Sequence, residues 1–433
     1  MNVNEKLFDF IKSSPSCFHA IANVAEKLEK AGAKRLVESQ KWEIKRGETC
    51  FVTRNGSSLI AVRIPEEIDG GFMVTASHSD SPTFKIKDKP ELEGGNYVRI
   101  NTERYGGMIF DSWFDRPLSV AGRILVRTEN GIKSKLVSTE PLLLIPHVAI
   151  HMQKSNDGLA YNPAIDLVPL YGGKDDKDTF MKKIAETAGV EADQIIGHDL
   201  YLVNRQEPTV WGANGEFISS PKLDDLQCAF SATEAFTSAI YENTGKSISV
   251  LFIADNEEVG SGTKQGAAST FLYDVLSRIS KALGYDEEDF RCLVARSMLL
   301  SADNAHAVHP NHPELADPTH KPLLNGGVVM KYNAAQLYTT DGVSAAIFRE
   351  ICKSAETPLQ IFCNRSDMRG GSTLGNISNT QVSMNAVDIG IAQLAMHSSY
   401  ETAGSLDTER MIRAMSEFYR VSLDISDETI SMK

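Results

Sequence analysis

The stretch LFIADNEEVGSG, residues 251–262, joins an apolar segment to a cluster of carboxylates. Residues 249–254 have the composition of a buried strand and lead directly into Glu257 and Glu258, and Gly260 then ends the extended pattern. Ligands bind at the carboxyl ends of strands in open α/β sheets. Two adjacent glutamates at such an end can divide the chemistry, one holding a metal and the other moving a proton. Taken alone, the stretch is more typical of a solvated acidic turn.

The composition of the chain is that of a soluble globular protein of more than one domain. Its 433 residues are 42% hydrophobic and 23% charged. The formal net charge of -13 disfavours nucleic acid and anionic membranes as partners. The sequence shows neither a signal peptide nor an apolar run long enough for a membrane span, so we expect a cytoplasmic protein. Its 6 cysteines have no CxxC spacing, which predicts reduced thiols rather than a cysteine zinc site.

A second strand end carries the pair His78 and Asp80. Residues 71–77 are apolar in the pattern of a strand, and the two polar side chains follow directly. A histidine can bind a metal through one ring nitrogen while a nearby carboxylate fixes the tautomer through the other nitrogen. The pair therefore fits a metal ligand and its orienting group, although a lone H-x-D is more often a surface turn.

Asp224 and Asp303 occupy further positions of the same kind. Residues 292–302 form a predicted strand that ends in Asp303, and His306 follows three residues later. Asp224 precedes an apolar helix-like segment, where helix capping alone would also explain a carboxylate. The last predicted strand leads to His397.

The region from residue 87 to about residue 216 has a different pattern of apolar and polar residues. Alternating apolar and polar residues predict a β-rich unit with one helix, inserted into the βα pattern of the rest of the chain. Within it, residues 142–152 carry His147 and His151. Their four-residue spacing suits one face of a helix, but Pro146 favours an extended segment. A core or interface role and a functional role for these histidines both remain open.

The candidate ligands indicate more together than separately. Five of them stand near different strand ends or helix starts: His78, Asp224, Glu258, Asp303 and His397. A parallel sheet would bring such positions together. Two histidines and three carboxylates without cysteine suit a pair of zinc, cobalt or manganese ions in a hydrolytic enzyme. Glu257 is then the expected base.

The motifs that contain these residues resemble those of the M18 metallopeptidases, the aspartyl aminopeptidases and their aminopeptidase I relatives. They occur in order along the chain: HSDSP at 78–82, KLDD at 222–225, DNEEVGS at 255–261, SADNAHAVHPN at 301–311 and MHS at 396–398. The resemblance implies an α/β fold with a zinc-exopeptidase-type mixed sheet flanked by helices. It also implies a catalytic domain formed by residues 1–87 and 217–433, with residues 88–216 as an inserted β-rich dimerisation domain.

The same resemblance implies a role for each candidate ligand. Two Zn²⁺ per subunit are expected, with Co²⁺ or Mn²⁺ as substitutes. One ion would be held by His78, Asp224 and Asp303, and the other by Asp224, Glu258 and His397. Glu257 would be the general base, and Asp80 would orient His78. Relatives often have Asn where this chain has Asp225, so an extra carboxylate is expected near the ions here.

The resemblance further implies how substrates are bound. Members that prefer acidic residues place a lysine and a tyrosine near the substrate side chain, which correspond to Lys331 and Tyr338. His306 is a further candidate for substrate binding. A histidine of a neighbouring subunit would complete the site, and it aligns best with His151, with His147 as the alternative. A homo-oligomer is therefore expected, a dodecamer built from dimers.

The expected function is that of a metal-dependent aminopeptidase. It would remove N-terminal residues, preferably Asp or Glu, from small peptides with a free N-terminus, by means of a water activated by two metals and Glu257 as base. An M18-type enzyme that prefers neutral residues such as Leu is the main alternative. A catalytically inert binding or assembly protein of the same fold and a two-metal phosphoesterase are the weaker alternatives, because the ligand set and Glu257 are intact and the chain has no phosphate-binding fingerprint.

Overall fold

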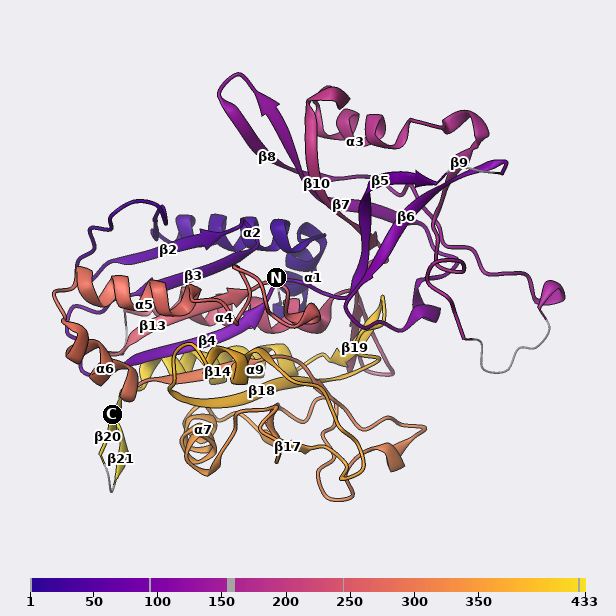
Figure 1. Cartoon of the computed structure of the whole chain (residues 1–433). Helices are drawn as coiled ribbons and strands as arrows, with labels where there is room; N and C mark the ends of the chain where they lie inside the picture. The colour runs from indigo at the N-terminus through magenta and orange to yellow at the C-terminus, as the bar shows by residue number, and fades with distance from the viewer. Residues whose placement is uncertain (1, 93–94, 154–159, 244, 427–428) are drawn as a thin grey trace.

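The computed structural model describes residues 2–92, 95–153, 160–243, 245–426 and 429–433. Within them, a 13-stranded mixed sheet, a 6-stranded sheet and a small C-terminal hairpin carry the fold. Figure 1 shows the two larger sheets as separate parts of the molecule, with the 6-stranded sheet at the upper right. The described part of the chain contains no helix that is both long and apolar enough to cross a membrane.

Parallel strands form the centre of the large sheet. They are β13 (Ile248–Ala254), β4 (Phe72–His78), β14 (Met298–Ala302) and β18 (Asn385–Leu394). β4 pairs in parallel with both β13 and β14, and β14 pairs in parallel with β18. Every residue of β4, β13 and β14 is buried, as is typical of a parallel sheet covered on both faces. The carboxyl ends of these strands therefore meet at one edge.

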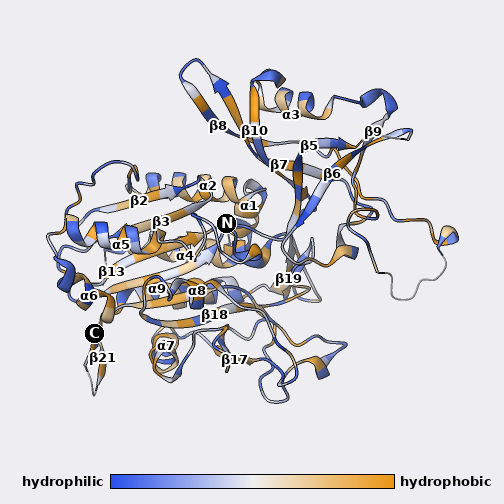
Figure 2. Cartoon of the chain, viewed as in Figure 1, coloured by the Kyte–Doolittle hydropathy of each residue, from blue (hydrophilic) through white to orange (hydrophobic). Residues whose placement is uncertain are grey.

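Helices cover both faces of the large sheet. One face packs against α1 (Val3–Ser13), α2 (Cys17–Lys30), α4 (Leu223–Glu242), α7 (Gly342–Ser354) and α9 (Asp407–Arg420). The other packs against α5 (Phe271–Ala282), α6 (Glu287–Ala295) and the short α8 (Leu374–Ser378). Leu251 points to the first face and Phe252 to the second, following the alternation of a strand. Figure 2 shows the mixture of hydrophobic and hydrophilic residues that one-sided packing gives to α5 and α7. The expected α/β fold with a mixed sheet flanked by helices is confirmed.

The remaining strands belong to the large sheet or to the hairpin at the C-terminal end of the chain. Their bounds are β1 (Lys34–Arg35), β2 (Thr49–Arg54), β3 (Ser58–Arg63), β11 (Thr209–Trp211), β12 (Phe217–Ser220), β15 (Ala305–His306), β16 (Val328–Tyr332), β17 (Leu359–Cys363), β19 (Glu401–Gly404), β20 (Leu423–Ile425) and β21 (Ile430–Met432). β3 pairs antiparallel with β13, so the sheet is mixed. β20 and β21 form the separate hairpin.

The second sheet has its own core. Its strands are β5 (Thr83–Leu92), β6 (Tyr97–Tyr105), β7 (Leu118–Thr128), β8 (Gly131–Ser138), β9 (Leu170–Gly173) and β10 (Ile195–Asn204), and α3 (Phe180–Ala188) packs on them. The pairs β5/β6, β7/β8 and β7/β10 are all antiparallel. This region therefore consists mainly of strands, as the sequence predicts. The assignment of residues 88–216 to a dimerisation domain stays a prediction.

One expected strand is wrong in its first half. Residues 292–302 were predicted to be extended, but Glu287–Ala295 is the helix α6, and the strand begins only at Met298. The helix starts at Asp286, whose carboxylate accepts a hydrogen bond from Asp289 N at 2.9 Å. This capping box precedes the apolar run and starts a helix that the run itself does not reveal.

Candidate metal centre

The candidate ligands converge at the carboxyl edge of the parallel strands. His78 is the last residue of β4, and Asp303 follows β14 directly. Glu258 lies in a single 3-10 turn, Glu257–Val259, which follows β13. Asp224 stands at the start of α4, and His397 lies in the turn after β18. The five side chains that the sequence suggested therefore lie together, as parallel pairing of the strands predicts.

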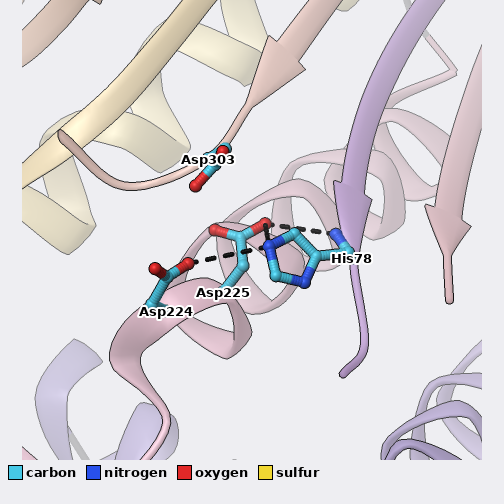
Figure 3. Close-up of side chains that lie close together, drawn as sticks. All are labelled: His78, Asp224, Asp225 and Asp303. Carbon is cyan, nitrogen blue, oxygen red and sulfur yellow. Dashed lines mark hydrogen bonds and ion pairs between the residues drawn. The ribbon is translucent and has the colours of Figure 1, made fainter. Parts of the chain in front are cut away.

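A first group of ligand atoms comes from His78, Asp224, Asp225 and Asp303 (Figure 3). One ligand atom from each residue lies within 4.8 Å of the others. His78 Nε2 is 3.6 Å from Asp224 Oδ1 and 4.0 Å from Asp225 Oδ2. The Asp225 carboxylate also accepts a hydrogen bond from the backbone N of His78 at 3.1 Å. The side chains of His78, Asp224 and Asp225 are buried, and that of Asp303 is 12% exposed. The extra carboxylate of Asp225 is thus a member of the group itself.

A second group shares Asp224 with the first. His397 Nε2 lies 3.5 Å from Asp224 Oδ2 and 3.5 Å from Glu258 Oε2. The ligand atoms of these three residues also lie within 4.8 Å of one another. The two carboxylate oxygens of Asp224 therefore point to different groups, Oδ1 to that of His78 and Oδ2 to that of His397.

The residues present fit divalent metal ions. Asp224 Oδ1, Asp225 Oδ1 and Glu258 Oε1 are buried and have no hydrogen-bond partner. A buried carboxylate oxygen without a donor costs free energy that a cation at the same place would offset. The donors are nitrogen and oxygen atoms only, which suits zinc, cobalt or manganese at a hydrolytic centre.

Burial and mutual repulsion shift the pKa values of the carboxylates in these two groups. Burial raises the pKa of Asp225 and of Glu258 well above the ordinary values, and Asp224 adds to both shifts. Burial also raises the pKa of Asp303 to about 6. Burial alone would raise the pKa of Asp224 as well, but the nearby rings of His397 and His78, at 3.5 Å and 3.6 Å, hold it below its ordinary value. Asp224 is therefore the carboxylate of the cluster that stays charged most readily.

Asp80 ties the two loops of the centre together. Its backbone O lies 3.1 Å from His78 Nδ1, and its Oδ1 lies 3.3 Å from the same nitrogen. Its carboxylate accepts hydrogen bonds from the backbone N of Glu257 and of Glu258, both at 3.2 Å. Asp80 contacts the ring of His78, and its role in orienting that ring stays a prediction. It also holds the turn that carries the two glutamates.

Glu257 lines the cavity at this edge. The cavity has a volume of about 320 Å³ and is lined by members of both ligand groups together with Glu257, Lys331 and Tyr338. Burial raises the pKa of Glu257 to about 8. The carboxyl group therefore lies beside the candidate ligands, and in the metal-free protein it holds its proton more tightly than an ordinary glutamate does.

Lys331 lies in the same cavity but is already paired. Its Nζ donates a hydrogen bond to the backbone O of Asp303 at 2.8 Å and lies 3.7 Å from Asp303 Oδ2. It also stands 5.1 Å from the ring centroid of Tyr338. Burial would lower the pKa of Lys331, but the charge of Asp303 raises it above its ordinary value. His306 lines the cavity as well, with its ring against Phe362.

His147 and His151 lie away from this cavity, in the region of the second sheet. Both are exposed, and neither lines the cavity of the metal centre. The ring of His147 stacks on Phe114 with centroids 3.8 Å apart, and its backbone N donates to Asp115 Oδ1 at 2.9 Å. His151 lies in a short 3-10 turn, Ile150–Met152. Which of the two histidines reaches a neighbouring site stays a prediction.

Glu401 is a further component of the centre, and its role could not be predicted from the sequence. Its buried carboxylate accepts hydrogen bonds from Asp224 N at 2.9 Å and from His397 N at 2.7 Å. It therefore fixes the backbone at two ligands, one of which is shared. Its spacing of four residues from His397 was the only signal, and such a spacing is common in chains that have no metal site.

Comparison with known proteins agrees with this geometry. The family model for aminopeptidase I zinc metalloprotease (M18) matches residues 10–419. A "Probable M18 family aminopeptidase 2" of Clostridium novyi (strain NT) is 42% identical over 427 residues, which cover 96% of this chain and 98% of that protein. A chain of the cryo-EM structure of the Ape4 and Nbr1 complex superposes with a TM-score of 0.93 at 35% identity, covering 96% of this chain and 85% of that one.

A second solved structure, the S. cerevisiae mApe1 dodecamer, superposes with a TM-score of 0.86 at 29% identity. It covers 97% of this chain, which in turn covers 96% of that one. The similarity extends over the full length in both sequence and structure, and the resemblance seen in the motifs is confirmed. The chain therefore belongs to the M18 family of zinc metallo-aminopeptidases.

Proposed function

We propose that this aminopeptidase binds two divalent metal ions and cleaves one acidic residue at a time from the N-terminus of small peptides. The observation that carries the proposal is the position of Asp224, whose two carboxylate oxygens face two different groups of ligand atoms. A carboxylate in this position can bridge two ions. His78 and Asp303 would complete one site, with Asp225 beside it, and Glu258 and His397 would complete the other.

The residues of this chain would hold the ions and move the proton. When bound, two zinc ions lower the pKa of a water toward neutrality and polarise the carbonyl of the peptide bond. Glu257 lies beside both ligand groups without belonging to either, so its carboxylate is free to take the proton of the water. It then passes the proton to the departing amine. Asp80 keeps the turn of Glu257 in place through the backbone.

An acidic preference rests on Lys331 and Tyr338. Both line the cavity, and Lys331 provides the positive charge that a substrate Asp or Glu would meet there. A charge-assisted hydrogen bond contributes about 1.5 to 3 kcal/mol, which corresponds to at least about tenfold selectivity over a neutral residue. His306 would contact substrate from the same cavity.

One observation favours a preference for neutral residues instead. Lys331 Nζ already donates to Asp303 O and faces the Asp303 carboxylate, so part of its charge is compensated within the chain. An acidic substrate would have to share this lysine with a metal ligand. A neutral residue such as Leu would need no contact with it.

A homo-oligomer is part of the proposal. The related S. cerevisiae mApe1 forms a dodecamer. The turn that contains His151 exposes Ile150 at 60% and Met152 at 79% of their surface, and large apolar side chains of this kind become buried at subunit interfaces. In a dodecamer built from dimers, His151 or His147 would then reach the cavity of a neighbouring subunit.

The test compares substrates across metals. Protein stripped of metal and refilled with zinc, cobalt or manganese is assayed on chromogenic amides of Asp, Glu, Leu and Ala, beside Lys331→Met. We expect metal-dependent turnover that favours Asp or Glu by at least about tenfold in kcat/KM in the wild type, and a loss of that preference in the variant.

Two outcomes would contradict parts of the proposal. The first outcome is turnover chiefly of the Leu amide, with the same ratio of kcat/KM for the Leu and Asp amides in the wild type and in Lys331→Met. It would still support an aminopeptidase, but it would contradict the role of Lys331 in selecting acidic residues. An absence of turnover with every metal, in assembled protein, would instead support an inert binding protein of the same fold.

A further inference from the structure

The segment that leaves β6 runs along the metal centre. Tyr105 is the last residue of β6, and Gly106 follows with a φ of +80°. A Cβ on Gly106 would lie 3.1 Å from Glu258 Cβ, so the backbone passes directly against this ligand. Two residues beyond Gly107, the backbone N of Ile109 donates to the O of His397 at 3.0 Å. The second sheet thus contacts two ligands of the large sheet.

Tyr105 itself reaches the group that orients the ligands. Its hydroxyl donates to Asp80 Oδ2 at 2.7 Å and accepts from Asn256 Nδ2 at 2.8 Å. Asn256 precedes Glu257 and has a left-handed φ of 61°. Its side-chain oxygen accepts from Thr263 Oγ1 and Gln265 Nε2, both at 2.8 Å. One hydroxyl therefore connects the loop of Asp80 with the turn of Glu257.

The partners of Asp80 show what this hydroxyl adds. The Asp80 carboxylate interacts with the ring of His78, with the backbone N of Glu257 and Glu258, and with Tyr105. The first three belong to the metal centre itself. Tyr105 comes from the other sheet, where its ring packs edge-on against Tyr201 with centroids 5.6 Å apart. The position of Asp80 therefore depends on how the second sheet is seated.

We propose that Tyr105 is a positioning residue, which fixes Asp80 and Asn256 and thereby sets His78 and Glu257 in the geometry that metal binding and proton transfer require. Tyr105 lines a second cavity, with Asp80 and Tyr201, and does not line the cavity that holds Lys331. Its loss should therefore change metal binding and turnover rather than substrate binding. The inference rests on the proposed metal-dependent activity.

The experiment compares Tyr105→Phe with Tyr201→Phe. The first variant keeps the ring and removes only the hydroxyl. The second removes the hydroxyl of a neighbouring tyrosine that makes no hydrogen bond to Asp80 or Asn256 within the described residues. Zinc affinity is measured by competition with a chromophoric chelator. The kcat and KM are measured on the amide that the wild type cleaves best.

The expected result for Tyr105→Phe is a loss of roughly 10- to 100-fold in zinc affinity and in kcat, because groups that orient metal ligands contribute at that level. KM should stay within about twofold, and Tyr201→Phe should match the wild type in every quantity. In an Asp80→Asn background, Tyr105→Phe should cost little further zinc affinity, because the two groups act as one unit.

The inference is overturned if Tyr105→Phe matches Tyr201→Phe in both zinc affinity and kcat, or if it raises KM alone. It is also overturned if the losses of Tyr105→Phe and Asp80→Asn in zinc affinity are additive. A wild-type protein that binds zinc without turnover would contradict the proposed function, and the zinc affinities would still decide the role of Tyr105.

Discussion

Carboxylates in the two large sheets show opposite behaviour. In the second sheet, Asp199 of β10 lies between Lys85 Nζ at 3.0 Å and Arg123 Nε at 2.9 Å. Burial alone would raise the pKa of Asp199, but these two cations hold it below its ordinary value. At the edge of the large sheet, burial and neighbouring carboxylates raise the pKa of Asp225 and Glu258 instead.

The difference lies in where the positive charge comes from. In the second sheet the chain supplies it. At the edge of the large sheet, Lys331 is the only lysine or arginine among the described residues that pairs with the ligand set, through Asp303. Buried carboxylates need compensating positive charge. At the edge of the large sheet, bound metal ions would supply the charge that lysine and arginine side chains supply in the second sheet. The candidate metal centre is thus distinguished by buried carboxylates that lack a lysine or arginine partner among the described residues, such as Asp225 and Glu258. Asp199, in the second sheet, has two such partners.

The largest expected effect separates chemistry from metal binding within the unpaired cluster. Glu257→Gln should lower kcat by about 10²- to 10⁴-fold, because the base is lost, while zinc content stays that of the wild type. Kinetics on the preferred amide and metal analysis of the same sample check both statements. Glu67→Gln, at an exposed ion pair with Lys246, serves as the matched control. A variant that keeps its activity would remove Glu257 as the base.

The pH dependence of stability should show the same contrast in metal-free protein. Burial raises the pKa of Glu257 and of Glu401 to about 8, and that of Asp255 to about 7. A carboxyl group whose pKa is raised on folding binds its proton more tightly in the folded state. The contribution of these carboxyl groups to the free energy of unfolding therefore increases as the pH falls through the raised values toward those of the unfolded chain. Two lysines act in the opposite direction over the same range, because burial lowers the pKa of Lys222 to about 7 and that of Lys27 to about 8.

Urea unfolding of metal-free protein measures this effect. Comparison with metal-free Glu257→Gln cancels the contribution of these lysines. We expect the free energy of unfolding to rise by at least about 1 kcal/mol more in the wild type than in the variant from about pH 8.5 to about pH 6.5. Zinc should reduce the rise, because it favours the ionised carboxylates. A rise that is no larger in the wild type than in Glu257→Gln would show that the chain compensates the cluster after all.

The smallest effect on turnover and zinc binding is expected in the second sheet. Asp199→Asn should destabilise the protein by about 1 to 3 kcal/mol, because it removes the charge-assisted contacts to Lys85 and Arg123. The wild-type contribution of Asp199 is present at neutral pH and is lost as the pH falls below about 4, since its pKa is depressed in the folded state. Thermal melts measure the loss, and kcat and zinc content should not change. A loss of zinc would show that the two regions are not separable at this residue.

The sequence predicted that the candidate ligands lie close together, because the position of each depends on local order. A buried strand such as β13 ends at a glycine-containing turn, and parallel pairing then brings the polar residues after β4, β13 and β14 to one edge. The strand expected from residue 292 failed for a local reason as well. The apolar pattern alone favours a strand there, but the capping box at Asp286 starts a helix that continues to Ala295.

The residues that hold the ligands could not be predicted in the same way. Tyr105 lies 25 positions from Asp80 and 151 from Asn256 along the chain, and its contacts depend on how the two sheets are seated. Glu401 acts through backbone groups of Asp224 and His397, which leave no pattern in side-chain chemistry. The predicted role of His151 or His147 would depend on a second copy of the chain.

The position of Asp224 between two groups of ligand atoms is tested most directly by counting metal ions. Metal-free wild type, Asp224→Asn and Asp199→Asn are dialysed against zinc, and the bound metal per chain is measured. We predict about two ions per chain for the wild type and for Asp199→Asn, and fewer than one for Asp224→Asn, because both sites lose a shared ligand. A single ion in the wild type, or two ions retained in Asp224→Asn, would contradict a shared carboxylate at the centre of the site.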